Sequence, residues 1–268
     1  MKTWFITGCS SGFGRAIAEA ALTAGHRVIA TARDVRSIAD LECDACRVLT
    51  LDVTDAANIR EAIAEAGGFD VLVNNAGYGL IGAVEECDDD QIRRNVETNF
   101  FGPMNVIRAA LPMLRGQKSG HIINISAAAA ISNYPGFGVY GAAKAALEYL
   151  SESLRLELAP MGIRVTLVEP GPFRTEFVTR SLDKASQPLA EYDGTSGKFS
   201  RLIASMNGKQ PGDPAKAAKA IFAIAEAESP PLRLVLGKYA NDKARRRAEG
   251  LEKERTAWEP IGMPTEFT

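Results

Sequence analysis

Short apolar runs alternate with longer amphipathic segments along most of the chain, and this alternation restricts the fold more than any other feature. The runs expected to form strands are 3–7, 27–32, 47–53, 70–75, 121–126, 164–169 and 232–236. Several of them, such as VLVNNA and HIINIS, lack strict alternation, which is typical of strands covered on both faces of a parallel sheet. Helical periodicity occupies the segments 14–24, 56–66, 89–114, 141–158 and 214–227. The pattern predicts an α/β fold: a doubly wound parallel sheet of about seven strands, with right-handed crossovers and helices on both faces.

The chain carries no internal repeat and no Pro/Gly/Ser-rich linker, so residues 1–268 are expected to form a single domain. Residues 172–212 depart from the alternation, because they are polar, contain glycine and have weak periodicity. A connection of this length in a compact domain is usually functional or disordered, and we interpret it as a substrate lid. A helical tail is expected from about residue 238, and its basic side chains are interpreted as a solvated helix face. These side chains are Lys243, Arg245, Arg246 and Arg247.

Charge and hydropathy argue against several classes of function. The formal net charge is -2, so no overall field favours nucleic acid or an anionic membrane as a partner. No run of about 18 apolar residues predicts a membrane-spanning helix. The N-terminal MKTWFITG lacks the apolar stretch of a signal peptide, so a cytoplasmic protein is expected. Cys43 and Cys46 form an isolated C-x-x-C with no histidine cluster, so no metal site is predicted.

A glycine-rich turn, TGCSSGFG over residues 7–14, joins the first expected strand to the first expected helix. Gly8 permits a tight turn, while Gly12 and Gly14 let the backbone approach a phosphate and pack the helix against the sheet. Backbone N–H groups at the helix start would face the same anion. Because the turn lies between a strand and a helix, it predicts a Rossmann-type dinucleotide site. The cofactor-binding candidates in the turn are Gly8, Ser10, Ser11, Gly12, Phe13 and Gly14.

The end of the second expected strand bears on the choice of cofactor. An NAD enzyme usually places an acid there, which accepts a hydrogen bond from the ribose 2′-hydroxyl. This chain has Ala32 followed by Arg33, and Asp34 lies beyond the strand end. A guanidinium can bind a 2′-phosphate through two charge-assisted hydrogen bonds, although a solvent-facing Arg33 is the alternative. The sequence therefore favours NADP(H) over NAD(H).

Further motifs along residues 3–175 resemble those of the short-chain dehydrogenase/reductase family, in particular its bacterial branch near retinol and 17β-hydroxysteroid dehydrogenases. T-G-x-x-x-G-x-G falls at residues 7–14, N-N-A-G at residues 74–77 and Y-x-x-x-K at residues 140–144. The resemblance implies cofactor contacts from a further set of residues. These are Asp52, Val53, Asn75, Ala76, Gly77, Tyr140, Lys144, Pro170, Gly171 and Thr175.

The same resemblance implies that Asn99 holds a proton-relay water and that the chain forms a homodimer or homotetramer through the helix carrying Tyr140. Independently of the family, Tyr140 and Lys144 lie four residues apart, so they share one face of a helix. A free phenol titrates near 10, and a nearby ammonium favours the phenolate. We therefore expect a lowered pKa for Tyr140 and a role for it as general acid and base.

The position of the family's catalytic serine, thirteen residues before the tyrosine, is Ala127 in this chain. Ser126 is one residue early and, on a strand, should face away unless the register shifts, but it stays among the catalytic candidates. Ser132 lies in the following loop. Three interpretations remain open. A bulge or Ser132 supplies the missing donor; the enzyme works slowly or on an undemanding substrate; or the chain binds cofactor without turnover.

The sequence thus predicts an NADP(H)-dependent oxidoreductase that transfers a hydride between nicotinamide and an alcohol or carbonyl of a small molecule. An apolar substrate is favoured by large side chains in the expected lid, although these could equally be lid packing. They are Phe173, Phe177, Leu182, Leu189, Tyr192 and Phe199. The alternative, raised by Ala127, is a non-catalytic NADP(H)-binding sensor or regulatory protein.

Overall fold

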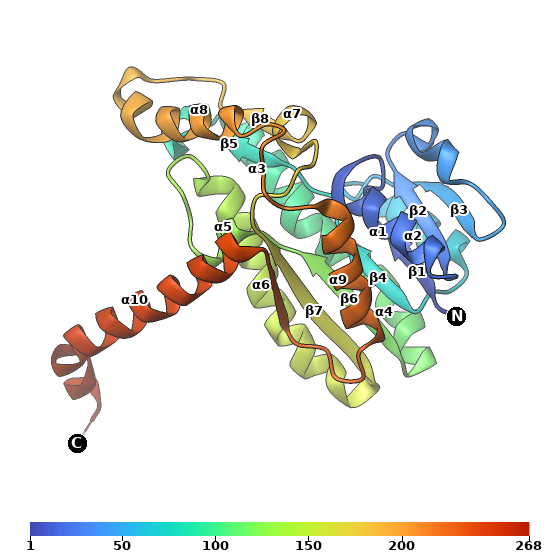
Figure 1. Ribbon diagram of the computed structural model, residues 1–268. Helices are drawn as coiled ribbons and strands as arrows, with labels where there is room; N and C mark the ends of the chain where they lie inside the picture. The colour runs from blue at the N-terminus through green and yellow to red at the C-terminus, as the bar shows by residue number, and fades with distance from the viewer. Residues whose placement is uncertain (268) are drawn as a thin grey trace.

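The computed structural model describes residues 1–267 and has a seven-stranded parallel sheet at its centre (Figure 1). The strand order is β3-β2-β1-β4-β6-β7-β9, so the chain builds outward from β1 in one direction and then returns to build in the other. The strands are β1 Thr3–Ile6, β2 Arg27–Ala32, β3 Cys46–Thr50, β4 Val71–Asn74, β6 Gly120–Ile125, β7 Ile163–Pro170 and β9 Arg233–Leu236. The reversal between β1 and β4 makes a crevice at the carboxyl ends of the strands, where ligands of doubly wound sheets bind.

Helices cover both faces of this sheet, as the alternation predicts. The α-helices of residues 1–267 are α1 Gly12–Thr23, α2 Ala56–Ala66, α3 Asp89–Val96, α4 Gly102–Gln117, α5 Ala128–Ile131, α6 Gly138–Leu158, α7 Phe177–Arg180, α8 Lys198–Ser205, α9 Pro214–Glu226 and α10 Lys238–Gly262. One apolar core lies between the sheet and α1 with α9, and the other lies between the sheet and α2, α4 and α6. The predicted fold class is therefore confirmed.

Adjacent residues of β1 show how one apolar strand serves both cores. Trp4 and Ile6 point into the core beneath α1 and α9, whereas Phe5 points into the core beneath α2, α4 and α6. All three side chains are fully buried. Full burial of a large apolar side chain contributes about 1.5–3 kcal/mol relative to exposure, so a strand of this kind needs cover on both faces.

Three differences from the sequence expectation bear on the candidate site. β3 ends at Thr50 rather than at residue 53, because the Asp52 carboxylate accepts hydrogen bonds from the backbone N–H and the hydroxyl of Thr54 and turns the chain. The single helix expected over 89–114 is wrong, because a π-helical turn at Glu97–Phe101 separates α3 from α4. A second, two-stranded parallel sheet pairs β5 (Gly79–Ile81) with β8 (Leu182–Lys184), joining the expected lid to the body.

The segment 172–212 contains α7, β8, α8 and short helical turns, and Figure 1 shows these elements gathered with β5 at one end of the molecule. At the other extreme of the chain, α10 leaves the body and extends away from it (Figure 1). Within residues 1–267, no helix is both long and apolar enough to cross a membrane. The same residues hold no group of three or more His, Cys, Asp or Glu side chains placed to bind a metal ion, and Cys43 and Cys46 are free thiols.

Candidate active site

The glycine-rich turn between β1 and α1 is held by hydrogen bonds to the residues after β4. The Thr7 hydroxyl accepts from the backbone N–H groups of Asn75 and Ala76, each at 2.9 Å. In return the Asn75 amide donates to the carbonyl oxygens of Thr7 and Gly8 at 2.9 and 3.0 Å. Gly8 has φ +71°, and a Cβ at Gly14 would collide with the Gly8 carbonyl. The glycines are therefore required by the conformation of the turn itself.

The start of α1 is open to an anion. Ser11 occupies the N-cap position in an extended conformation, but its side chain accepts no hydrogen bond from the helix. The N–H groups of the first turn thus lack a side-chain cap, which is the arrangement that binds phosphate at helix N-termini. Thr175 lies 3.6 Å from the position a Cβ would take on Gly12, and Phe13 packs edge-to-face on Phe173 with ring centroids 5.1 Å apart. The first residues of the expected lid therefore border this turn.

At the end of β2, Arg33 is exposed and makes no ion pair with any residue of 1–267. Its acidic neighbour Asp34 is occupied, because its carboxylate pairs with Arg36 at 2.9 Å and accepts from the Arg36 backbone N–H. Hydrogen bonds from Arg36 hold the pKa of Asp34 below its usual value. Arg33 is thus available to an added anion, whereas Asp34 is committed to the protein.

The remaining cofactor candidates line the same edge of the sheet. The backbone N–H of Asp52 donates to Asn58 at 2.7 Å, and the buried side chain of Val53 packs against Gly102 at the start of α4. Pro170 is the last residue of β7, and the N–H of Gly171 donates to Leu236 at 3.0 Å. The residues predicted from six separate parts of the sequence therefore lie along the carboxyl ends of the strands.

Lys144 and Asn99 meet beside Gly77, and Tyr140 lies one turn before Lys144 on α6. A Cβ at Gly77 would lie 2.6 Å from Asn99 Oδ1 and 3.2 Å from Lys144 Nζ, so only glycine leaves room for both groups. Lys144 is buried and donates from Nζ to the carbonyl of Ile125 at 3.0 Å. Tyr140 is 7% exposed and its hydroxyl has no hydrogen-bond partner within residues 1–267.

The π-helical turn explains how Asn99 reaches this point. Its amide donates to the carbonyls of Tyr78 and Asn95, both at 2.9 Å, while its Oδ1 atom is buried without a donor. Single π-helical turns recur at functional sites because they re-aim one side chain of a helix. An unpartnered buried oxygen costs free energy unless a ligand or water supplies a proton, so Asn99 Oδ1 fits the implied water-holding position.

Burial shifts the pKa values of Tyr140 and Lys144 in opposite directions. It lowers the pKa of Lys144 to about 8 and raises the pKa of Tyr140 above its usual value. Burial thus shifts the pKa of Tyr140 in the direction opposite to that expected from the sequence, because it disfavours the phenolate. A hydrogen bond to the phenolate, or a further positive charge in the site, is needed to bring that pKa toward neutrality.

The three residues around the missing serine point in different directions. The Ser126 hydroxyl donates to Glu148 Oε1 at 2.6 Å, about two turns along α6 from Tyr140. Ala127 packs instead in a cluster with Tyr140, Phe137 and Ile81. Ser132 ends α5 and lines a separate cavity beside α10. The choice of Ser126 as a catalytic candidate is therefore corrected: strand alternation directs its hydroxyl to Glu148, and Ala127 holds the place near Tyr140.

An apolar wall extends from Tyr140 to the lid. Phe137 and Phe177 pack against the Tyr140 ring with centroids 5.3 and 5.9 Å away, and Phe199 of α8 packs on Phe137 at 5.1 Å. Leu182 and Ile203 complete the contact from the lid side. Of the large lid side chains expected near a substrate, Phe177, Leu182 and Phe199 therefore join this wall.

The profile of the short chain dehydrogenase family matches residues 2–186 of the chain. The chain belongs to the short-chain dehydrogenase family. Oxidoreductase BOA17 of Botryotinia fuckeliana is 38% identical over 272 residues, covering 98% of both chains. Retinol dehydrogenase 8 of Bos taurus is 33% identical, covering 87% of this chain and 80% of its own. The family and the likeness to retinol dehydrogenases expected from the motifs are confirmed.

Solved structures of short-chain dehydrogenases share the arrangement. One from Streptomyces avermitilis is 42% identical, with a TM-score of 0.93, covering 99% of this chain and all of its own. One from Burkholderia cenocepacia, in complex with NADP, is 26% identical, with a TM-score of 0.77 and 96% coverage of both chains. The Streptomyces avermitilis structure aligns with almost the whole of this chain, so residues 172–212 and α10 lie within the aligned length.

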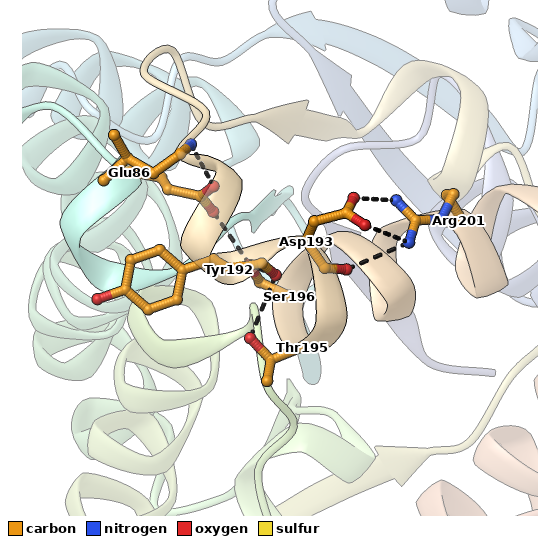
Figure 2. Close-up of polar contacts among 7 residues, drawn as sticks. Glu86, Tyr192, Asp193, Thr195, Ser196 and Arg201 are labelled. Atoms are coloured by element: carbon orange, nitrogen blue, oxygen red, sulfur yellow. Dashed lines mark hydrogen bonds and ion pairs between the residues drawn. The ribbon is translucent and has the colours of Figure 1, made fainter.

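A buried carboxylate that the sequence reasoning missed, Glu86, connects residues 172–212 to the rest of the protein, and Figure 2 shows its bond to Ser196. Glu86 accepts hydrogen bonds from the N–H of Ala83 at 2.6 Å, the N–H of Leu189 at 2.9 Å and the hydroxyl of Ser196 at 3.1 Å. Burial alone would raise the pKa of Glu86, but these hydrogen bonds outweigh it and lower the pKa. Glu86 belongs to the acidic run EECDDD, which reads as solvated surface, so only the fold reveals its role.

Glu148 was also missed, although it lies four residues after Lys144 and shares its helical face. It accepts a hydrogen bond from the Ser126 hydroxyl and lies 3.8 Å from Arg233, which also pairs with Glu169 at 3.1 Å. Burial raises the pKa of Glu148, and it raises that of Glu169 to about 7. Ser126 and Glu169 of this network directly precede Ala127 and Pro170. The network therefore helps to hold these two chain segments of the candidate site in place.

Proposed function

We propose that this chain is an NADP(H)-dependent oxidoreductase that transfers a hydride between nicotinamide and an alcohol or carbonyl group of a small apolar molecule. The observation that carries the proposal is that Lys144 and Asn99 meet beside Gly77, with Tyr140 one turn before Lys144 on α6, at the same sheet edge as the glycine-rich turn. Tyr140 is 7% exposed and lies at one end of an apolar wall, which supports an apolar substrate over a charged one.

The residues present fit a dinucleotide. The uncapped start of α1 with Gly8, Gly12 and Gly14 would hold the pyrophosphate, and Arg33 would bind the 2′-phosphate that distinguishes NADP from NAD. Since family likeness alone does not choose between the two cofactors, the preference rests on Arg33 and on the absence of an acid at Ala32. The remaining candidate contacts to the adenine, the riboses and the nicotinamide are Ser10, Ser11, Phe13, Asp52, Val53, Asn75, Ala76, Gly77, Tyr140, Lys144, Pro170, Gly171 and Thr175.

The cofactor supplies or accepts the hydride when it is bound. Tyr140 donates its hydroxyl proton to the carbonyl oxygen during reduction and accepts a proton from the alcohol during oxidation. Lys144 keeps two of its ammonium protons after the bond to Ile125, and these can bind a ribose hydroxyl and favour the phenolate of Tyr140. Asn99 Oδ1 can accept a hydrogen bond from a water that returns the proton to Tyr140.

Ala127 weakens this reaction. A side-chain hydroxyl near the reacting oxygen stabilises negative charge as it develops, and loss of one such donor costs on the order of 100-fold in rate. The place beside Tyr140 is occupied by a methyl group, and Ser126 is committed to Glu148. The methyl group of Ala127 beside Tyr140 thus favours a second candidate function, a non-catalytic NADP(H)-binding protein, alongside a slow oxidoreductase.

Turnover measurements separate the two candidates. The purified protein is incubated with NADPH and a panel of apolar ketones and aldehydes, and the absorbance of the nicotinamide at 340 nm is followed. Turnover that Tyr140→Phe abolishes supports the oxidoreductase. Binding of NADPH without oxidation by any member of the panel supports the non-catalytic protein, and failure to bind either nicotinamide overturns both.

We further propose a cytoplasmic homodimer or homotetramer that associates through α6. The exposed apolar side chains of that helix support the assembly, because Tyr149 is 74% and Leu156 is 77% exposed. Light scattering on the parent and on Leu156→Glu tests it: the parent should be dimeric or tetrameric, and the variant should shift toward monomer. A monomeric parent at micromolar concentration would contradict the assembly.

A further inference from the structure

A second cavity lies outside the proposed active site, between α10 and the loop that follows α5. Its volume is about 380 Å³. Three basic side chains of α10 line it together with two tyrosines, one of which also belongs to α10, and a serine. These residues are Lys243, Arg246 and Arg247, and Ser132, Tyr134 and Tyr239. The mechanism proposed for Tyr140 uses none of them.

The three cations of this cavity have no carboxylate partner in ion-pair contact within residues 1–267. Within residues 1–267, neither Lys243, Arg246 nor Arg247 forms an ion pair. The adjacent carboxylate, Asp242, is bound by Lys238 at 2.7 Å and by Arg245 at 3.4 Å, both of which lie outside the cavity lining. Farther along the helix, Arg255 is paired with Glu252 and Glu259. Of the four cations of α10 without an ion pair within residues 1–267, three thus line the cavity, and the fourth, Lys253, lies outside it.

Lys243 is held in place without a carboxylate. Its Nζ atom lies 3.1 Å from the centroid of the Tyr134 ring, which is cation–π contact. Partial burial lowers the pKa of Lys243 to about 8, because no anion offsets the lost hydration. A bound anion would supply the negative charge that Lys243 lacks and would favour its charged form. The ammonium is therefore positioned for a ligand by an aromatic ring.

The two tyrosines leave one hydroxyl proton for a ligand. The Tyr134 hydroxyl donates to the Tyr239 hydroxyl at 3.0 Å, so the proton of Tyr239 remains available for donation. Gly250 completes the lining, and a Cβ on it would meet no atom within 4 Å. Ammonium, guanidinium and phenol donors around an open space match an oxyanion with several acceptor atoms.

We propose that this cavity binds the phosphate or carboxylate group of a small molecule. Tyr134 links it to the active site, since its ring stacks on Phe199 at 5.0 Å and packs against Phe137, which contacts Tyr140. The group has two possible sources: the distal end of an apolar substrate whose reacting carbon lies at Tyr140, or a separate anionic metabolite.

Isothermal titration with inorganic phosphate, at constant ionic strength and on the full chain, tests the site without any turnover. The variant Lys243→Gln/Arg247→Gln removes two cavity cations. The matched control Lys216→Gln/Lys253→Gln removes the same charge from exposed lysines of α9 and α10 outside the lining. Phosphate affinity should fall tenfold or more in the cavity variant and less than twofold in the control.

A second variant, Gly250→Asp, places a carboxylate in the open space and should abolish phosphate binding while thermal unfolding remains close to that of the parent. The proposal is overturned if the parent binds no phosphate, or if the cavity variant and the control lose affinity alike. It is also overturned if neither loses affinity, because the phosphate then occupies the glycine-rich turn.

Paired substrates distinguish the two sources of the anion. A ketone-bearing fatty acid and its methyl ester differ only in the distal charge. A lower KM for the acid, lost in Lys243→Gln/Arg247→Gln with kcat for the ester unchanged, assigns the cavity to the substrate. Equal KM values together with cavity-dependent phosphate binding assign it to a separate anion. Because titration needs neither cofactor nor turnover, failure of the oxidoreductase proposal leaves its result interpretable.

Discussion

Restoring a hydroxyl at Ala127 tests how much of the rate the missing serine controls. The side chain of Ala127 is 8% exposed and packs with Tyr140, Phe137 and Ile81. The new hydroxyl of Ala127→Ser would lie where the reacting oxygen is expected, so it should stabilise the transition state more than the ground state. Removal of one such donor costs on the order of 100-fold in kcat, or about 2.7 kcal/mol, which is the upper limit of the gain.

The apolar surroundings of Ala127 reduce this limit. Without substrate, the new hydroxyl faces aromatic rings and a methyl group, and a buried hydroxyl without a partner costs about 1–3 kcal/mol. We therefore expect a gain of about tenfold in kcat for ketone reduction together with a loss of stability. In a chain of 268 residues, 1 kcal/mol corresponds to about 2–4 °C in Tm.

The assay is steady-state oxidation of NADPH with one ketone that the parent reduces, beside a thermal unfolding curve for each protein. Ala129→Ser is the matched control, because Ala129 belongs to the same cluster and is 5% exposed. It should lower Tm without raising kcat. The reasoning fails if Ala127→Ser leaves kcat unchanged on such a ketone, or if Ala129→Ser raises it equally.

Other variants test the remaining assignments. Arg33→Ala should weaken NADPH binding by about 10- to 100-fold and leave NADH unchanged, measured by fluorescence titration; equal losses for both would contradict the 2′-phosphate role. Tyr140→Phe should abolish turnover while NADPH still binds, whereas Lys144→Ala should damage both; near-native rates in Tyr140→Phe would refute the acid/base assignment. Since hydrogen bonds lower the pKa of Glu86, its stabilisation exists above its unfolded pKa near 4.5 and is lost as the pH falls through the folded value. The Tm difference between the parent and Glu86→Gln should therefore be largest near neutral pH and shrink below pH 4.5; a constant difference would show that the carboxylate charge is not involved.

Much of the site could be predicted because its residues are tied to local backbone geometry. Gly8 and Gly14 are required by a positive φ and by a close approach of backbone atoms, which are properties of the turn itself. Tyr140 and Lys144 share a helical face by spacing alone. The strands could be found from apolar runs, because a parallel sheet buried on both faces tolerates few polar residues.

The sequence of this protein by itself determined the strand and helix order, the glycine-rich turn and the absence of an acid at Ala32, the last residue of β2, because these depend on short-range periodicity and on single residues. The tertiary structure alone decided three further matters. It turned Ser126 toward Glu148, a partner 22 residues away, and it re-aimed Asn99 through a π-helical turn. It also buried Tyr140 enough to raise a pKa that spacing had suggested would fall. Desolvation and long-range hydrogen bonds depend on what the rest of the chain places around a side chain, and no local pattern encodes that environment.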